Sequence, residues 1–288
     1  MIGSYSTLSR LIVDYAYRPF VRQFYYSDKK LSDRLTSKHF AMFGKGLSHP
    51  NLSFAVNVSN RPFNVLATNH VADFHFNGDA QCFPVYRYTA AGDRVDNITD
   101  WAMKQFRQHY QNERISRDDI FHYVYAVLHH PAYCQKYALN LRREFPRIPF
   151  YEDFRQWAKW GKQLMQLHLA YEQAKPSRLV RKDRDPTKVR QAVTPRLLAH
   201  KESGVIEVDT LTTLRGVPPE AWDYRLGTYT ALEWVLERYK ERAPRDPTIR
   251  EKFNTYRFAD YKEQVIDLLR RVCTVSVETM KIVSQMPP

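Results

Sequence analysis

Short runs rich in β-branched and aromatic residues characterise the first third of the chain. The segments LSFAVNVS, FNVLATN and CFPVYRYT are such runs, and Asn, Pro, Gly and Asp residues separate them. Runs of this composition between turn-forming residues are typical of β-strands. The pattern therefore predicts a β-rich N-terminal part over residues 1–97, with strands between about Leu8 and Tyr88.

The apolar period changes to that of helices over residues 98–175. Ser116 and Asp119 have the spacing of a capping box, and Pro131 can end one helix and begin the next. Apolar residues recur at helical spacing at Ile120, Tyr123, Val124, Val127 and Leu128, at Tyr133, Tyr137 and Leu141, and at Phe154, Trp157, Gly161, Leu164 and His168. This part is therefore predicted to be helical.

The C-terminal part, residues 176–288, begins in a basic stretch without apolar period, KPSRLVRKDRDPTKVRQAVTPR, which predicts a linker. The segment RLLAHKESGVIEVD predicts a hairpin that turns at Glu202, Ser203 and Gly204. Helices are predicted over PPEAWDY, TALEWVLERYKER and FADYKEQVIDLLRRVCTVSVETMKIV, the last with Tyr261, Val265, Leu268, Val272 and Val275 on one stripe. The predicted fold class is α+β, with the three parts as subdomains of one domain.

The composition of the 288 residues is that of a globular protein, since 43% are hydrophobic and 14% aromatic. No apolar run approaches the roughly 18 residues that a membrane helix requires. Three distant cysteines, Cys82, Cys134 and Cys273, favour reduced thiols over a disulfide framework. We therefore expect a soluble, cytoplasmic protein without a membrane partner.

A net charge of +13 and a pI near 9.6 point to a polyanionic partner. Basic residues gather near the N-terminus, among aromatic residues, and again in the predicted linker and hairpin. The candidate DNA-binding residues are Arg18, Arg22, Lys29, Lys30, Arg34, Lys38, Arg87, Arg178, Arg181, Lys182, Arg184, Lys188, Arg190, Arg196 and Lys201. A basic, solvent-exposed surface without a ligand is the alternative.

Motifs for catalysis or cofactor binding are missing from the sequence. There is no G-x-G-x-x-G, phosphate loop, H-E-x-x-H, G-x-S-x-G or methyltransferase tetrapeptide. No catalytic residue, cofactor-binding residue or metal ligand is predicted.

Three weaker patterns have ordinary structural alternatives. Asp28-Lys29-Lys30 with Asp14 resembles part of a nuclease pattern, and His70, Asp73, His75 and Asp79 could contribute to a metal site. They would make the chain a magnesium- or manganese-dependent nuclease, but a turn and a strand also explain them. His129 and His130 could relay protons, although histidines near a helix end more often bond to carbonyl groups.

Several segments together resemble the C-terminal specificity domain of type ISP restriction-modification enzymes. They are YRPFVRQFYY, DNITDWA, DIFHYVYAVLHHPAYCQKYALNLRREFPRIPF, GKQLMQLHLAYE and VCTVSVETMKIV, in that order, from about Tyr15 to Val283. The resemblance implies recognition of a short sequence in double-stranded DNA for phage defence. It also implies an adenine-N6 methyltransferase and an ATP-dependent helicase and nuclease in the same or a companion polypeptide. S-adenosylmethionine, ATP and magnesium would belong to those domains, and none to this chain.

The aromatic residues Phe121, Tyr123, Tyr125, Tyr133 and Tyr137 are then interpreted as a rigid support, with the string RREFPRIPF fixing the exit of the chain. A helical protein-interaction module that docks on a helicase or methyltransferase and contacts little DNA is the alternative function.

Overall fold

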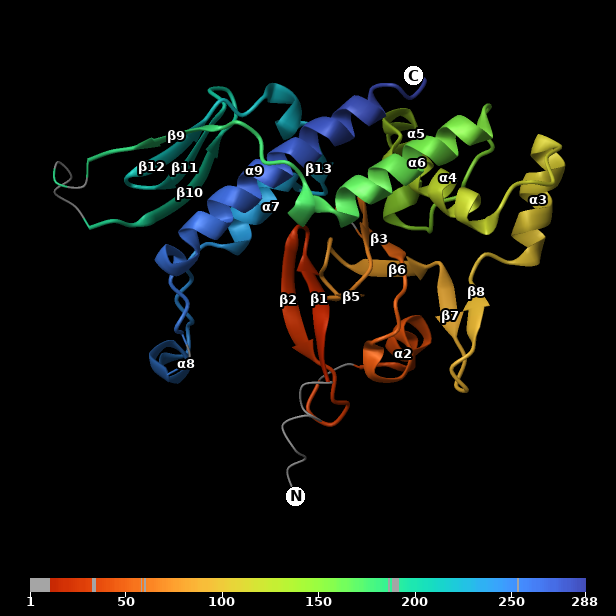
Figure 1. The fold of residues 1–288 in the computed structure, drawn as a ribbon, viewed down its shortest axis with the longest axis horizontal. Helices are drawn as coiled ribbons and strands as arrows, with labels where there is room; N and C mark the ends of the chain where they lie inside the picture. Colours follow the sequence, from red (N-terminus) through yellow and green to blue (C-terminus); the bar gives the residue numbers. More distant parts are fainter. Residues whose placement is uncertain are drawn as a thin grey trace. The chain divides into compact units, whose positions relative to one another are not determined.

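The computed structural model describes residues 11–32, 35–57, 59, 61–185, 187, 192–252 and 254–288. Two compact units are formed: unit 1 comprises residues 1–169, 226–228 and 282–288, and unit 2 comprises residues 170–225 and 229–281. The predicted β-rich part and nearly all of the helical middle part fall in unit 1. Strands come first, helices follow, and strands with helices end the chain, which confirms the predicted α+β class (Figure 1).

Unit 1 contains two three-stranded sheets and a small ribbon. The strand orders are β2-β1-β5, β4-β3-β6 and β7-β8. The bounds are β1 (Ile12–Arg18), β2 (Val21–Tyr26), β3 (Ser53–Asn57), β4 (Val65–Thr68), β5 (Val71–Ala72), β6 (Ala80–Pro84), β7 (Tyr86–Tyr88) and β8 (Arg94–Asp96). The three strand-like segments of the sequence are thus confirmed: the first forms β3, the second β4, and the third contributes to β6 and β7, which belong to different sheets.

The hairpin of β1 and β2 lies in the region predicted to be β-rich, although neither of its strands was predicted individually, and the helix α2 (Ser37–Phe43) was not predicted. One face of the hairpin packs Tyr15 and Tyr25 against the buried Phe43. The opposite face leaves Phe24 exposed. Because aromatic residues occupy both faces, the hydrophobic alternation that marks a strand is weak here.

The helices of unit 1 are α3 (Asp100–Tyr110), α4 (Arg117–His129), α5 (Pro131–Lys136) and α6 (Phe154–Leu169), with a 3-10 turn η2 (Asn140–Arg142). The capping box of Ser116 and Asp119 is confirmed, and Pro131 is the first residue of α5. All five predicted stripe residues of α6 are buried. Helices α4 and α6 pack closely at Gly161, where a Cβ atom would lie 1.7 Å from the His122 carbonyl oxygen.

Aromatic side chains of α4 and α5 hold the chain that follows them. The Tyr123 hydroxyl donates to the Pro149 carbonyl at 2.8 Å and accepts from the Tyr151 amide at 2.6 Å. The Tyr133 hydroxyl donates to the Arg147 carbonyl at 3.0 Å. Tyr123 and Tyr133 are buried, so the packing expected of this aromatic support is confirmed for them.

Helix α4 also covers the sheet of β4, β3 and β6. The Tyr125 hydroxyl accepts from the Ala67 amide at 2.9 Å, and the Phe54 and Phe121 rings lie 5.0 Å apart. The core of unit 1 therefore lies between this sheet and the α4 and α6 pair.

Unit 2 is built on a four-stranded antiparallel sheet of order β10-β11-β12-β9. The strands are β9 (Val180–Asp183), β10 (Pro195–His200), β11 (Val205–Asp209) and β12 (Thr212–Arg215). The predicted hairpin is confirmed, since His200 pairs with Val205 across the turn. The prediction of a linker throughout the basic stretch is wrong for β9, because Val180–Asp183 pairs with β12 and gains its hydrogen bonds from there.

The later elements of the chain are the 3-10 turn η5 (Pro219–Trp222), β13 (Arg225–Leu226), β14 (Tyr229–Thr230), α7 (Ala231–Arg238), α8 (Pro247–Lys252) and α9 (Phe258–Val283). Helix α9 buries Val265, Leu269 and Val272. The predicted stripe is wrong at its start, because Tyr261 is exposed and stacks on Tyr256 instead. No helix among the described residues is long and apolar enough to cross a lipid bilayer.

Candidate nucleic-acid interface

Arg18, at the end of β1, is occupied by contacts within unit 1. Its guanidinium donates to Asp73 Oδ1 at 2.7 Å and lies 4.0 Å from the centre of the Tyr17 ring. The Tyr15 hydroxyl donates to the other oxygen of Asp73 at 2.6 Å, and burial, then this bond, raises the pKa of Tyr15. With its side chain only 13% exposed, Arg18 fastens β1 to the turn at Asp73.

The other predicted residues of unit 1 are more accessible. Arg22 lies 3.8 Å from Asp14 on the exposed face of the hairpin. The exposed residues are Lys29, Lys30, Lys38 and Arg87. Arg34 lies outside the described residues.

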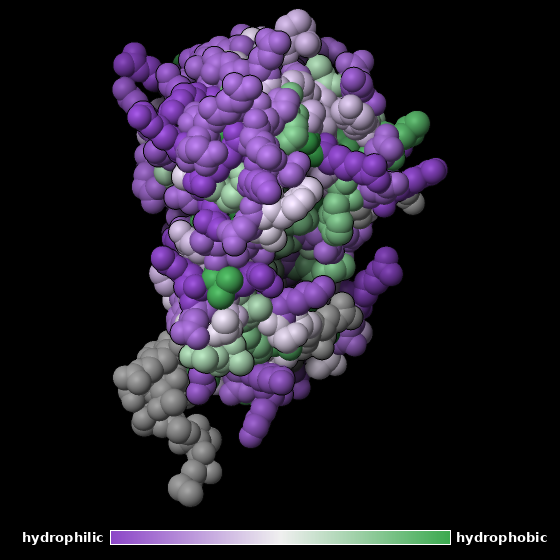
Figure 2. Space-filling model, turned by 90° about the vertical axis from the view of Figure 1, so that its right-hand side faces the viewer, coloured by the Kyte–Doolittle hydropathy of each residue, from purple (hydrophilic) through white to green (hydrophobic). Residues whose placement is uncertain are grey.

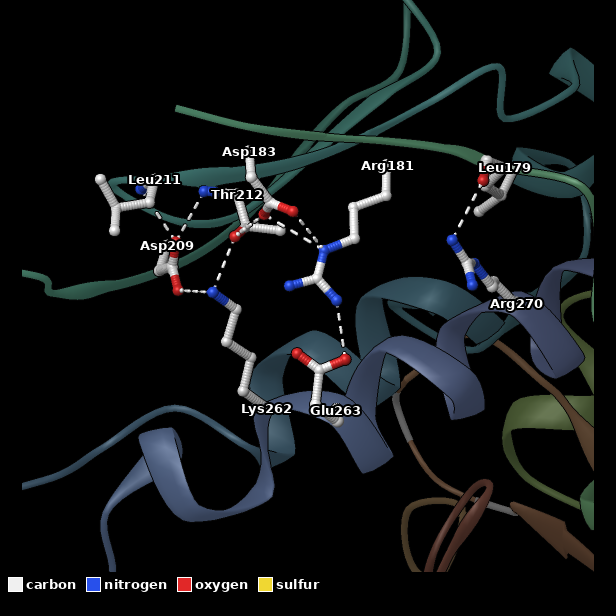
Figure 3. Close-up of polar contacts among 9 residues, drawn as sticks. All are labelled: Leu179, Arg181, Asp183, Asp209, Leu211, Thr212, Lys262, Glu263 and Arg270. Carbon is white, nitrogen blue, oxygen red and sulfur yellow. Dashed lines mark hydrogen bonds and ion pairs between the residues drawn. The ribbon is translucent and has the colours of Figure 1, made fainter. Parts of the chain in front are cut away.

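In unit 2, Arg181 lies on the face of the sheet that packs against α9 (Figure 3). Its guanidinium donates to Glu263 at 2.7 Å and to Asp183 at 2.8 Å. The bond to Glu263 contributes most to raising the pKa of Arg181. The charge of Arg181 is thus compensated inside the unit, and the side chain joins β9 to α9.

A second cation, Lys262, completes this inner contact (Figure 3). Its Nζ lies 2.7 Å from Asp209 Oδ2 and donates to the Thr212 hydroxyl, also at 2.7 Å. Asp209 Oδ1 accepts from the Leu211 and Thr212 amides, and the carboxylate is buried. The sheet is therefore fixed to α9 by ion pairs from β9 and β11 and by a hydrogen bond to β12.

The opposite face of the sheet is open within unit 2. The strand registers place two rows of side chains on it, Val180, Arg215, Val205 and His200 in one and Lys182, Thr213, Glu207 and Leu198 in the other. Val180 is 56% and Leu198 43% exposed. His200 lies 3.0 Å from Glu207, whereas Lys182 and Arg215 have no ion pair within the described chain. We call this surface the open sheet face.

Arg215 was not among the residues predicted from the sequence. The alternation in TTLR, with Thr212 and Leu214 buried and Thr213 and Arg215 directed away, is the signal that could have identified it. The prediction concentrated on the basic stretch before the hairpin and overlooked the strand after it.

The remaining predicted residues of unit 2 fall into three groups. Arg178, Arg184 and Arg196 are exposed. Lys201, in the hairpin turn, pairs with Glu233 of α7 at 2.8 Å, so it fastens the turn to the helix. Lys188 and Arg190 lie outside the described residues.

The weaker patterns occupy ordinary structural positions. Asp28 Oδ1 accepts from the Lys30 amide at 2.7 Å, so Asp28-Lys29-Lys30 forms a turn, which was the structural alternative to a nuclease site. His75 Nδ1 lies 3.4 Å from Asp79 Oδ1. Across the described residues, no three His, Cys, Asp or Glu side chains come together as a metal site would require.

The histidines at the end of α4 bond to carbonyl groups. His129 Nδ1 lies 2.8 Å from the Tyr125 carbonyl oxygen, and His130 Nε2 lies 2.7 Å from that of Pro287. Burial lowers the pKa of His129 to about 4. It also lowers the pKa of His168 well below its usual value, and His168 Nδ1 lies 2.7 Å from the Tyr125 hydroxyl. The His129 and His168 rings are therefore neutral near pH 7.

Comparison with known proteins identifies relatives over nearly the whole chain. The sequence matches the family described as the type ISP C-terminal specificity domain over residues 3–268. A chain in the cryoEM structure of the DrdV–DNA complex is 51% identical with a TM-score of 0.91, and the match covers 99% of this chain and 29% of that one. Curated proteins gave no match.

Two further solved structures share the fold. A nuclease-deletion mutant of the type ISP restriction-modification enzyme LlaGI, in complex with a DNA substrate mimic, is 24% identical with a TM-score of 0.74, over 97% of this chain and 25% of that one. The ATP-dependent type ISP enzyme LlaBIII, bound to DNA, is 21% identical with a TM-score of 0.75, over 96% and 18%. The chain thus spans less than a third of the length of each of these three proteins.

Proposed function

Because the chain belongs to the family of type ISP C-terminal specificity domains, we propose that it recognises a specific sequence in double-stranded DNA. The observation that carries this proposal is the 51% identity to a chain in the DrdV–DNA complex, over 99% of this sequence. The net charge of +13 supports it, because phosphate contacts supply most of the non-specific affinity of a protein for DNA.

The open sheet face supplies phosphate contacts in this proposal. Lys182 and Arg215 present uncompensated charges there, whereas Arg181 and Lys201 are held in ion pairs. Phosphate contacts position a protein on the duplex, and side chains at base edges read the sequence. Exposed arginines can bond to guanine through two parallel hydrogen bonds, so Arg87 and Arg196 are our candidates for base reading.

The chain acts, in this proposal, as one part of a larger restriction-modification enzyme. An adenine-N6 methyltransferase and an ATP-dependent helicase and nuclease would lie elsewhere in the same polypeptide, since the match covers only 18–29% of the related chains. S-adenosylmethionine, ATP and magnesium would be bound by those parts. The described residues offer neither a phosphate loop nor a metal-binding group for them. The enzyme would act in the cytoplasm, where it meets incoming DNA.

The test is selection from a duplex library with a randomised central segment, followed by titration of the selected duplex and a scrambled duplex. We expect one enriched sequence and an affinity for it at least about tenfold above the scrambled duplex, since specific sites usually exceed non-specific ones by far more. Equal binding of all duplexes would contradict sequence recognition. If the chain binds no duplex even at low salt, the alternative function, a protein-interaction module, is the better hypothesis.

A further inference from the structure

Unit 1 contains a hollow of about 200 Å³ that is lined by basic side chains. Arg155, Lys159 and Lys162 come from α6, and Arg114 comes from the loop between α3 and α4. We call it the basic hollow. The three residues of α6 follow at spacings of four and three, which places them on one side of the helix. Arg114 lines the same hollow as these three residues, together with Asp119 and His122 of α4.

The positive charge of the basic hollow is poorly compensated. Its lining holds four cationic side chains and one carboxylate, which gives the hollow a formal charge of +3. Asp119 is already engaged, because its Oδ2 accepts from the Ser116 amide at 3.0 Å and from the Ser116 hydroxyl at 2.7 Å. None of the four cations has an ion pair within the described part of the chain.

A neighbouring hollow of about 400 Å³ shows the contrasting arrangement. Arg107 lies 3.8 Å from Glu113 there, and Arg117 pairs with Asp100 and lies 3.4 Å from Asp96. Its two arginines are therefore compensated within the chain, and two carboxylates, those of Asp100 and Glu113, line it. Positive side chains that lie close together without carboxylate partners repel each other. A bound anion would relieve this repulsion in the basic hollow.

The shape and chemistry of the basic hollow favour a phosphate backbone over an enclosed small molecule. Small-molecule sites are usually larger, about 300–1,000 Å³, and largely enclosed. All four cations are exposed. From Arg155 to Lys162 the helix rises about 10 Å, which equals about three base-pair steps along the axis of a DNA duplex and is long enough to contact more than one phosphate. The side of unit 1 that carries α3 in Figure 1 faces the viewer in Figure 2 and is mostly hydrophilic.

We propose that the basic hollow binds consecutive phosphates of the DNA backbone, in addition to any contact made by the open sheet face. This inference rests on the proposed function. The side chains grip the backbone without reading bases, so the hollow adds affinity and fixes the position of the domain on the duplex, whatever the sequence bound.

The test compares Lys159→Gln and the double variant Arg155→Gln, Lys159→Gln with Lys104→Gln. Lys104 is the matched control, because it is an exposed lysine on a helix of the same unit that lies outside the basic hollow and lines the hollow with two carboxylates. Each variant is titrated with the selected and the scrambled duplex at several salt concentrations. Melting curves check that the folds are retained.

We expect the slope of log affinity against log salt to fall by about 0.9 for Lys159→Gln and by about 1.8 for the double variant. The preference for the selected duplex should be unchanged, and Lys104→Gln should behave as the wild type. If the wild type binds its duplex but the double variant keeps the full slope, the basic hollow is not a DNA site, although the proposed function stands. A wild type that binds no duplex overturns both.

An acidic peptide is the competing occupant. A polyglutamate peptide that binds the wild type but not the double variant, and leaves DNA binding unaffected, would assign the hollow to a protein partner and overturn the proposal. If the scrambled duplex displaces the peptide from the wild type, the duplex occupies the same residues, and the proposal is supported.

Discussion

Arg181 and Lys182 are adjacent basic residues of β9 whose replacement should have different consequences. Their side chains leave the strand on opposite sides, Arg181 toward Glu263 of α9 and Lys182 onto the open sheet face. We expect Lys182→Gln to weaken DNA binding and to leave stability unchanged. Arg181→Gln should lower stability and leave the salt dependence of binding unchanged.

The expected magnitudes follow from these positions. A single phosphate contact contributes about 0.9 to the log–log salt slope, so its loss changes the ratio of affinities at about 50 and 200 mM salt by about 3.5-fold. The double variant Lys182→Gln, Arg215→Gln should change that ratio by about 12-fold. The ion pairs of Arg181 are partly exposed, with 30% of its own side chain accessible, so their loss should cost only about 0.5–1 kcal/mol.

The assay is fluorescence anisotropy of a labelled duplex titrated with each variant at four salt concentrations, with urea unfolding of the same samples. The neighbouring positions serve as each other's control, because both substitutions remove one positive charge from the same strand. Equal loss of slope in both single variants would show that only net charge matters. An unchanged slope in the Lys182 and Arg215 double variant would remove the open sheet face from the interface.

Three further predictions concern the scaffold of unit 1. Gly161→Ala gains about 1 kcal/mol of helix propensity but forces a Cβ atom into α4, so we expect the free energy of unfolding in urea to fall by at least about 2 kcal/mol. The control Gln163→Ala, at an exposed position of the same helix, should be near neutral. A stabilised Gly161→Ala variant would refute the close contact between the helices. Tyr123→Phe leaves the part-buried Tyr151 amide and Pro149 carbonyl without their partner and should cost about 1–3 kcal/mol in urea unfolding, whereas Tyr137→Phe should cost little. Equal effects would contradict the assigned hydrogen bonds. His129 is neutral in the fold, with a pKa near 4 against about 6.5 when unfolded, so its stabilisation is complete above pH 6.5 and is lost as the pH falls toward 4. Between pH 7 and 5 the loss should be about 2 kcal/mol, and His129→Asn should flatten this dependence; an unaltered profile would show that other groups cause it.

The sequence alone predicted those features that depend on residues close together in the chain. The capping box joins Ser116 to Asp119, the hairpin turns within a few residues at Gly204, and the buried side of α6 follows from the period of its apolar residues. In each case one helical turn or one tight turn contains the interacting groups. The excess of positive charge is likewise a property of composition, and it indicates the class of partner that we propose, a polyanion.

The tertiary structure decided which of the basic residues keep an accessible charge. Arg18 finds Asp73 at a separation of 55 residues, and Arg181 finds Glu263 at a separation of 82. Strand β9 forms because β12 offers it a partner, although the local sequence has the composition of a linker. Arg114 joins the α6 cations only because the loop before α4 packs beside that helix. Whether a charge is compensated depends on carboxylates within a few ångströms in space, and a pattern read along the chain contains no information about such distances.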